Sequence, residues 1–275
     1  MSLYSPLQLA EAFIRAGELG DALQALSDHL DSAPEDAAAR RLRVDVLMRL
    51  PGVDYARRAL ADLDQLTEVT AEDWVQRSVI LQGLEDTAGC SAAMAAAYRL
   101  QPEDERLLER YLSTLEQNGQ IEEARRLVDE QPATWRWLQI AGELAERAGD
   151  GEAAYQRYSE AVSAIEHRLD TEQNQLASTL KGMLVVKRAG AAYGLGLLEQ
   201  AAADYRAASD YFPKDLSYPL MQAAMLWLKG EQGTALELAQ QVLRDMPALT
   251  EYLRDAAASD GRLTPFLEAV IPQDV

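Results

Sequence analysis

The feature that most constrains this chain is a recurring punctuation by glycine, alanine and proline. A glycine is followed five residues later by an alanine and, about twelve residues after that, by a proline. The copies, some incomplete, are Gly17 with Ala22 and Pro34, Pro102, Gly119 with Ala124, Gly149 with Ala154, Gly196 with Ala201 and Pro213, and Gly230 with Ala235 and Pro247. Apolar residues between them recur at spacings of three and four, and strand-like alternation is scarce. The pattern predicts a repeated helix–turn–helix unit and an all-helical chain.

These residues resemble the tetratricopeptide repeat, which has a period of about 34 residues and small residues where its two helices touch. The first positions of seven repeats would be Leu3, Ala37, Ala71, Glu105, Trp135, Gly182 and Leu216. The resemblance implies an all-α fold, a right-handed superhelix of about seven helical hairpins over residues 3–249. Because the end of such a stack needs a cap, residues 250–275 are expected to form capping helices and a tail.

Two repeats depart from the pattern at their turn. Glu85 stands where the third repeat should have its glycine, and Pro51-Gly52 occupies the turn of the second, whose alanine comes one residue early. These departures leave the local register of the two repeats open, whereas the architecture is expected to be intact.

Two steps between first positions differ from 34 residues. The step of 30 residues reflects an early Pro132, which predicts a short second helix in the fourth repeat. The step of 47 residues adds 13 residues, which at ~3.6 residues per turn lengthen two helices by roughly two turns each. We therefore expect a projecting helical hairpin near 162–182, with a turn at Asp170-Thr171 and the two longest helices of the molecule.

Composition excludes several classes of function. The 275 residues include 26 Lys and Arg against 45 Asp and Glu, a net charge of −19 that disfavours a nucleic-acid partner. One Cys and two His cannot build an intramolecular disulfide or a Cys/His zinc cluster. Neither a leader pattern nor the ~18 consecutive apolar residues of a membrane span is present. We expect a soluble, cytoplasmic protein with no membrane partner, and the excess of Arg over Lys suggests a GC-rich bacterial gene.

The residues that could act in catalysis or ligand binding have simpler roles in helix packing or turns. Cys90 falls where the repeat has a small packing residue, so a buried, inert thiol is expected. His29 occupies a position between helices, His167 lies near the predicted hairpin tip, and neither has a second ligand at metal-binding spacing. Gly194-Leu195-Gly196 follows a helix, so it is a turn instead of a phosphate-binding loop. We expect no enzyme activity, no cofactor and no metal site.

A basic island interrupts the acidic first half of the chain. Salt bridges to neighbouring acidic helices explain it more simply than a binding patch does. Its members are Arg40, Arg41, Arg43, Arg49, Arg57 and Arg58.

The resemblance places the binding surface in a groove. In tetratricopeptide proteins the first helices line the concave face, and the family binds extended or helical peptides there. The groove positions carried over to this chain are Arg41, Asp45, Arg49, Arg106, Glu109, Arg136, Gln139, Glu143, Met183, Val186, Tyr193, Leu220 and Trp227. Tyr193 and Trp227 would be the anchors, because buried aromatic groups dominate binding energy, but aromatic residues on the helices of such a stack more often pack between repeats.

The sequence thus predicts an interaction scaffold whose concave groove binds a peptide or a partner helix. The alternative is a self-assembling scaffold, a homo-oligomer that pairs through the 162–182 hairpin or the C-terminal helices. A ligand-sensing or catalytic accessory is a remote third possibility. The residues from Phe266 to Ile271 could either cap the stack or reach into the concave face as an internal ligand.

Overall fold

The computed structural model describes residues 5–169 and 175–271, and every regular element within these ranges is helical, as predicted. The helices are α1 (Pro6–Ala16), α2 (Leu19–Ser32), α3 (Ala37–Arg49), α4 (Val53–Asp64), α5 (Ala71–Gly83), α6 (Thr87–Leu100), α7 (Glu105–Gln117), α8 (Ile121–Asp129), α9 (Trp135–Arg147), α10 (Gly151–Leu169), α11 (Gln175–Gly194), α12 (Leu198–Tyr211), α13 (Ser217–Lys229), α14 (Gln232–Asp245), α15 (Leu249–Ser259), the 3₁₀ turn η1 (Gly261–Leu263) and α16 (Thr264–Val270).

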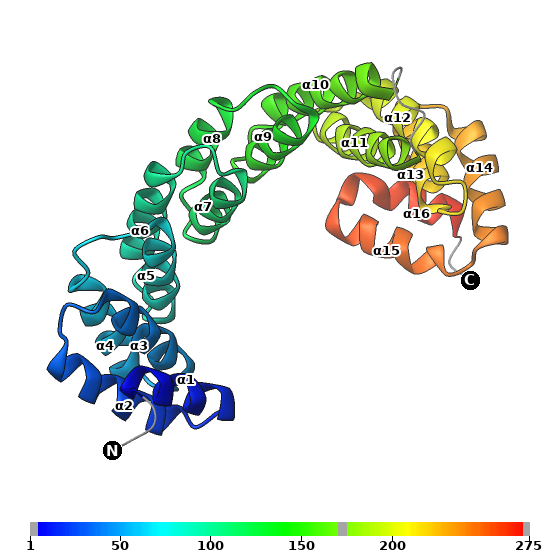
Figure 1. The fold of residues 1–275 in the computed structure, drawn as a ribbon. Helices are drawn as coiled ribbons and strands as arrows, with labels where there is room; N and C mark the ends of the chain where they lie inside the picture. The colour runs from blue at the N-terminus through cyan, green and yellow to red at the C-terminus, as the bar shows by residue number, and fades with distance from the viewer. Residues whose placement is uncertain (1–4, 170–174, 272–275) are drawn as a thin grey trace. The chain divides into compact units, whose positions relative to one another are not determined.

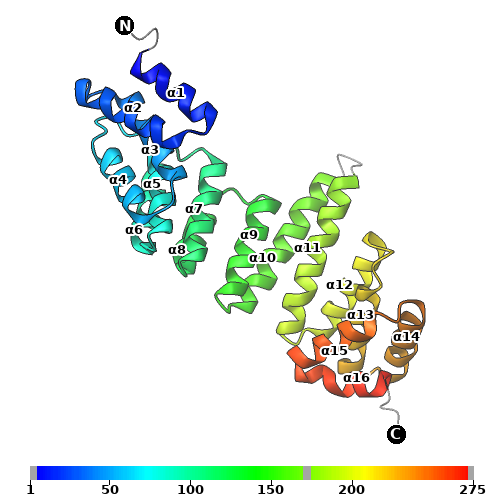
Figure 2. The same ribbon diagram turned by 90° about the horizontal axis from the view of Figure 1, so that it is seen from below.

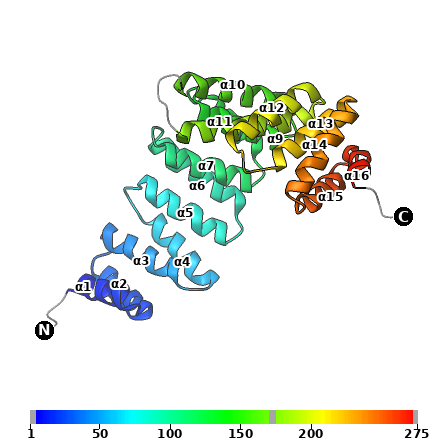
Figure 3. The same ribbon diagram turned by 90° about the vertical axis from the view of Figure 1, so that its right-hand side faces the viewer.

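The chain divides into two compact units, residues 1–120 with α1–α7 and residues 121–275 with α8–α16. In unit 1 each helix packs against the next one in the sequence, and Figure 3 shows this order from α1 to α7. The same holds from α8 to α14 in unit 2 (Figure 1). A boundary at residue 249 between repeats and capping helices remains a prediction.

The repeat register is confirmed at the helix starts. Four first helices begin at the predicted first positions, which are Ala37, Ala71, Glu105 and Trp135. All seven second helices begin 16 residues after a predicted first position, at Leu19, Val53, Thr87, Ile121, Gly151, Leu198 and Gln232. The spacing of small residues therefore specifies where each hairpin turns, although Leu3 itself lies outside the described residues.

Small residues lie where the paired helices touch. The alanine four positions into the second helix is fully buried at Ala22, Ala124, Ala154, Ala201 and Ala235. On α9, a Cβ added to Gly142 would lie 2.5 Å from Cε1 of Tyr158 on α10. Glycine at this position allows the close packing of the two helices.

The two irregular repeats have the predicted effect on helix length. The helices on either side of Asp170, α10 and α11, have 19 and 20 residues and are the longest among the described elements. Residue 170 itself and the predicted hairpin tip lie outside the described residues. Helix α8 has only nine residues and ends before Pro132, as expected from the short step.

Three of the six arginines in the basic island, Arg40, Arg41 and Arg43, form the predicted ion pairs between helices. The guanidinium of Arg43 (α3) donates to both carboxylate oxygens of Asp62 (α4) at 2.5 and 2.8 Å, and Arg40 approaches Asp62 at 3.4 Å. Arg41 on α3 donates from Nε and Nη2 to the Asp73 carboxylate on α5, both at 2.8 Å. Hydrogen bonding to Asp62 raises the pKa of Arg43 above its usual value. These contacts hold α3 against α4 and α5.

The departure at Glu85 produces a strained turn. Glu85 has φ 61°, in the left-handed region, and it takes the turn position that Gly17, Gly119, Gly149, Gly196 and Gly230 occupy in other repeats with positive φ. A non-glycine residue in this region costs ~1–2 kcal/mol. Changing Glu85→Gly removes that strain. It also increases the conformational entropy of the unfolded chain, which lowers the free energy of unfolding by ~0.4–1 kcal/mol.

We therefore expect Glu85→Gly to stabilise unit 1 by about 0.5–1 kcal/mol, measured by urea denaturation. Glu85→Ala, which keeps a Cβ at the same φ, is the control. An equal gain in both variants would show that the charge of Glu85, and not its backbone, is the source of the strain.

Candidate partner-binding faces

Three of the first helices of unit 1, α3, α5 and α7, carry a polar surface that we call the first-helix face of unit 1. Gln76 Nε2 (α5) donates to Asp45 Oδ1 (α3) at 2.8 Å, and Gln82 Nε2 (α5) donates to Gln117 Oε1 (α7) at 2.7 Å. These bonds show that the three helices lie side by side. Gln76 Oε1 is buried and has no hydrogen-bond partner. The face therefore contains an acceptor that nothing in the described chain satisfies.

The residues predicted for the groove in unit 1 have different roles. Arg41 is held by Asp73 and also donates to the carbonyl oxygen of Glu68 at 2.7 Å, so it stabilises the fold. Arg49 and Arg106 are exposed, and Glu109 is half-buried. Since Asp45 is bound by Gln76, the most accessible predicted side chains here are those of Arg49 and Arg106.

The predicted groove residues of unit 2 begin with a polar cluster. Gln139 Nε2 donates to Glu143 Oε1 at 2.9 Å, and Lys187 on α11 pairs with the same carboxylate at 3.0 Å. Arg136 is exposed, and Met183 is 49% exposed. Glu143 thus joins the first helices α9 and α11.

One predicted groove residue is corrected by the structure. Leu220 is 0% exposed and packs in the core of unit 2, so it cannot contact a partner. Val186 is half-buried. The register carried over from the tetratricopeptide repeat placed Leu220 on the groove side of α13. In the structure both sides of α13 are covered, because later helices of the chain also pack on it.

Residues 249–271, which comprise α15, η1 and α16 and which we call the C-terminal segment, cover the aromatic anchors of unit 2. Phe266 is fully buried with its ring 5.8 Å from the Trp227 ring, centroid to centroid. Tyr193 donates its hydroxyl to Asp260 Oδ2 at 2.6 Å, and the Arg262 guanidinium lies 4.2 Å from the centroid of the Tyr193 ring. Figures 1 and 2 show this segment, orange to red, beside α13.

The C-terminal segment packs on the preceding helices and also contacts the predicted aromatic anchors. Helix α16 packs on α13 and α14, as a cap does, and its Phe266 also contacts Trp227. Tyr193 and Trp227 are half-buried, and each is bound by the chain itself. A partner would have to displace the C-terminal segment to reach them.

Electrostatics keep this contact intact at neutral pH. Hydrogen bonds from Arg262 and Tyr193 hold the pKa of Asp260 well below its usual range. Burial, together with the bond to Asp260, raises the pKa of Tyr193 to about 12. The Asp260 contribution to stability is therefore present above its unfolded pKa of ~3.9 and is lost as the pH falls through its lower folded pKa.

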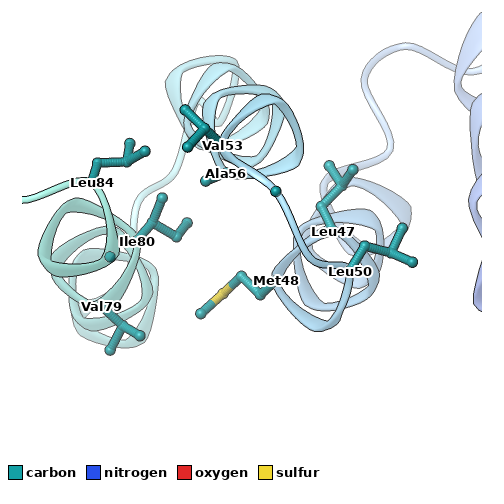
Figure 4. A pocket seen from close by; sticks show the side chains of 10 residues that line it. Leu47, Met48, Leu50, Val53, Ala56, Val79, Ile80 and Leu84 are labelled. Carbon is teal, nitrogen blue, oxygen red and sulfur yellow. The ribbon is translucent and has the colours of Figure 1, made fainter.

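Unit 1 contains an apolar pocket that sequence reasoning missed. It has a volume of about 320 Å³ and lies between α3, α4 and α5 (Figure 4). Its lining is Leu47, Met48, Leu50, Gly52, Val53, Ala56, Val79, Ile80, Gly83 and Leu84. We call it the α3–α5 pocket.

The pocket originates in the unusual turn of the second repeat. Leu50 is extended, at φ −87° and ψ 136°, and Gly52 has φ 126°, so the chain leaves α3 without the compact left-handed turn of other repeats. Ala56 is half-buried, whereas the equivalent residue is at most 3% exposed in the other six repeats. The signal was present in the sequence as Pro51-Gly52, but the space that it opens could not be deduced from spacing.

The remaining candidates for chemistry are structural. Cys90 is 3% exposed, with Sγ 3.2 Å from Ser78 Oγ, so its predicted burial is confirmed. His29 Nε2 lies 2.8 Å from Asp36 Oδ2, and the side chain of His167 is outside the described part. Within residues 5–169 and 175–271 no group of three or more His, Cys, Asp or Glu is arranged to hold a metal ion. None of the helices described has the length and apolar character needed to cross a membrane.

Comparisons with known proteins give matches to solved structures alone. No protein-family model matches the chain, and no significant match is found among curated proteins. The C-terminal part of a TPR repeat-containing protein from Cytophaga hutchinsonii is similar with 10% identity over 87% of this chain and 93% of that one, at a TM-score of 0.56. The MamA protein is similar with 13% identity over 66% and 94%, at a TM-score of 0.50. These similarities and the repeat register confirm the predicted resemblance at the level of the fold: the chain folds as a tetratricopeptide-repeat protein.

Proposed function

We propose that this chain is a non-enzymatic scaffold that binds a protein partner, as a peptide or a helix, along the first-helix face of unit 1. The observation that supports this most is the buried acceptor Gln76 Oε1, which has no partner in the middle of that face. Leaving such an acceptor unsatisfied costs ~1–3 kcal/mol. A ligand that donates a hydrogen bond to this amide after a small side-chain rotation recovers that free energy.

The neighbouring side chains suit an extended or helical polypeptide. The amides of Gln76 and Gln82 on α5 each carry donors and an acceptor, and they bond to the neighbouring helices α3 and α7. Arg49 on α3 and Arg106 on α7 are also exposed. The corresponding aromatic positions of unit 2, Tyr193 and Trp227, are occupied by the C-terminal segment. The proposed surface is therefore in unit 1, in contrast to the sequence-based choice of anchors.

The test is a selection of peptides from a random display library on the full chain, followed by titration of the selected peptides. We expect Gln76→Ala to weaken binding by about fivefold to tenfold, the effect of one hydrogen bond of ~1–1.4 kcal/mol. The matched control is Gln24→Ala on α2, because Gln24 also donates to an aspartate, Asp28, at 2.7 Å, but from a second helix.

Binding that is unchanged in Gln76→Ala, or equally weakened in Gln24→Ala, would contradict the proposed surface. Circular dichroism of both variants checks that the helices are retained.

A further inference from the structure

The α3–α5 pocket has the composition of a site for an apolar side chain. Its ten lining residues are all apolar or glycine. Val53 and Val79 are 51% and 44% exposed although both belong to the lining, so apolar surface is open to solvent at this point. Clustered exposed apolar residues next to a hollow mark interaction sites more often than scattered ones do. The volume of about 320 Å³ is at the lower end of the ~300–1,000 Å³ found for ligand pockets.

The lining comes from three helices, as Figure 4 shows. Met48 and Leu50 lie on the α3 side of the pocket, and Ile80 and Leu84 lie on the α5 side. Val53 and Ala56 of α4 lie between these two sides. The pocket is thus bounded by two neighbouring first helices, α3 and α5, which also carry the first-helix face of unit 1.

Two residues of opposite charge adjoin lining residues in the sequence, one at the end of α3 and one after α5. Arg49 lies in the sequence between the lining residues Met48 and Leu50, and Glu85 follows the lining residue Leu84. Both side chains are exposed, and neither makes a side-chain hydrogen bond or an ion pair with any residue in the described part of the chain.

Nearby charges do not neutralise this pair. Asp45, one turn before Arg49, accepts a hydrogen bond from Gln76. Asp54, beside Val53, lies 3.7 Å from Arg57 of its own helix. The cation on the α3 side and the anion on the α5 side are therefore available to groups outside the chain.

We propose that the α3–α5 pocket binds one apolar side chain, of the Leu, Ile, Met or Phe kind, from a partner polypeptide that carries an acidic residue on the Arg49 side and a basic residue on the Glu85 side. This inference rests on the proposed function and names the class of partner. The two opposite charges fix the direction in which the partner chain crosses the pocket, because the reversed direction places like charges together.

The first part of the experiment tests the pocket. Peptides selected from the display library on the full chain are titrated against Val79→Glu. We expect at least a tenfold loss of affinity, about the effect of losing one apolar anchor. Val79 is half-exposed on a helix, so the glutamate is tolerated by the fold. The matched control is Val69→Glu, since Val69 is 38% exposed and lies outside the pocket.

The second part tests the charges by repeating the selection on two further variants. On the wild-type chain we expect peptides with an apolar residue flanked by Asp or Glu on one side and Lys or Arg on the other. On Arg49→Glu the acidic residue should be replaced by a basic one, and on Glu85→Lys the basic residue by an acidic one. Unchanged preferences in both selections would overturn the proposed partner class.

The outcomes separate this inference from the proposed function. Peptides that are weakened by Gln76→Ala but not by Val79→Glu would leave the first-helix face as the binding surface and overturn the pocket. Peptides insensitive to both variants would overturn both proposals. If decanoate bound in a Val79-dependent manner and no selected peptide did, the pocket would be a site for a small apolar molecule, and the polypeptide proposal would be wrong.

Discussion

Replacing Phe266 by alanine is expected to lower the free energy of unfolding of unit 2 by about 3–5 kcal/mol, the range for a buried Phe→Ala change. Phe266 is fully buried, and its ring contacts that of Trp227. Its loss leaves a cavity and removes the main apolar contact between α16 and α13. Native-state hydrogen exchange of the amides in α13 and α16 measures the effect within this unit.

The comparison variant is Trp227→Ala. Trp227 is half-buried and packs on the same core, so we expect a clear but smaller loss of stability. A loss below about 1 kcal/mol for Phe266→Ala would mean that the C-terminal segment is not docked on Trp227 in solution. In that case the aromatic positions of unit 2 would again be free to act as binding anchors.

A second large effect is expected at Asp62, which holds α4 against α3 in unit 1. Its side chain is 7% exposed and is bonded to Arg43 and Arg40, whose side chains are 18% and 12% exposed. Asp62→Ala leaves two partly buried guanidinium groups without their carboxylate. Removing one partner of a buried ion pair costs ~3–5 kcal/mol. Urea denaturation, followed by hydrogen exchange in α3 and α4, gives the change in the free energy of unfolding.

A double variant distinguishes charge from packing at this site. In Asp62→Leu with Arg43→Met, no charge of that pair is left buried, and we expect a smaller loss than in Asp62→Ala. If the double variant were the less stable of the two, the unpaired guanidinium charge would not be the main cost of Asp62→Ala.

The sequence predicts the helical register because the relevant interactions are local and repeat. A small residue such as Ala22 or Ala154 is required wherever two helices of one hairpin touch, and both are fully buried. Residues added between two such contact points lengthen the helices that join them, as in α10 and α11. Each second helix therefore begins at the same offset of 16 residues from its predicted first position.

The candidate site was predicted less well because it depends on contacts that are distant in the sequence. Tyr193 meets Asp260 across 67 positions, so no repeat pattern indicates that the C-terminal segment covers it. Leu220 was misplaced for the same reason, since later helices bury a face that the carried-over register leaves open. The α3–α5 pocket results from one irregular turn, at Pro51-Gly52, whose geometry the sequence signals only as a departure from the repeat.

Hydrogen–deuterium exchange of the full chain, with and without a peptide selected on it, tests most directly where a partner binds. Our account predicts slower exchange at residues 38–53 and 72–85, which carry the first-helix face of unit 1 and the α3–α5 pocket. It predicts no change at residues 186–193 and 220–227, where the C-terminal segment already covers Tyr193 and Trp227. Protection of residues 186–193 and 220–227, with faster exchange in residues 249–271, would place the partner in unit 2 and contradict it.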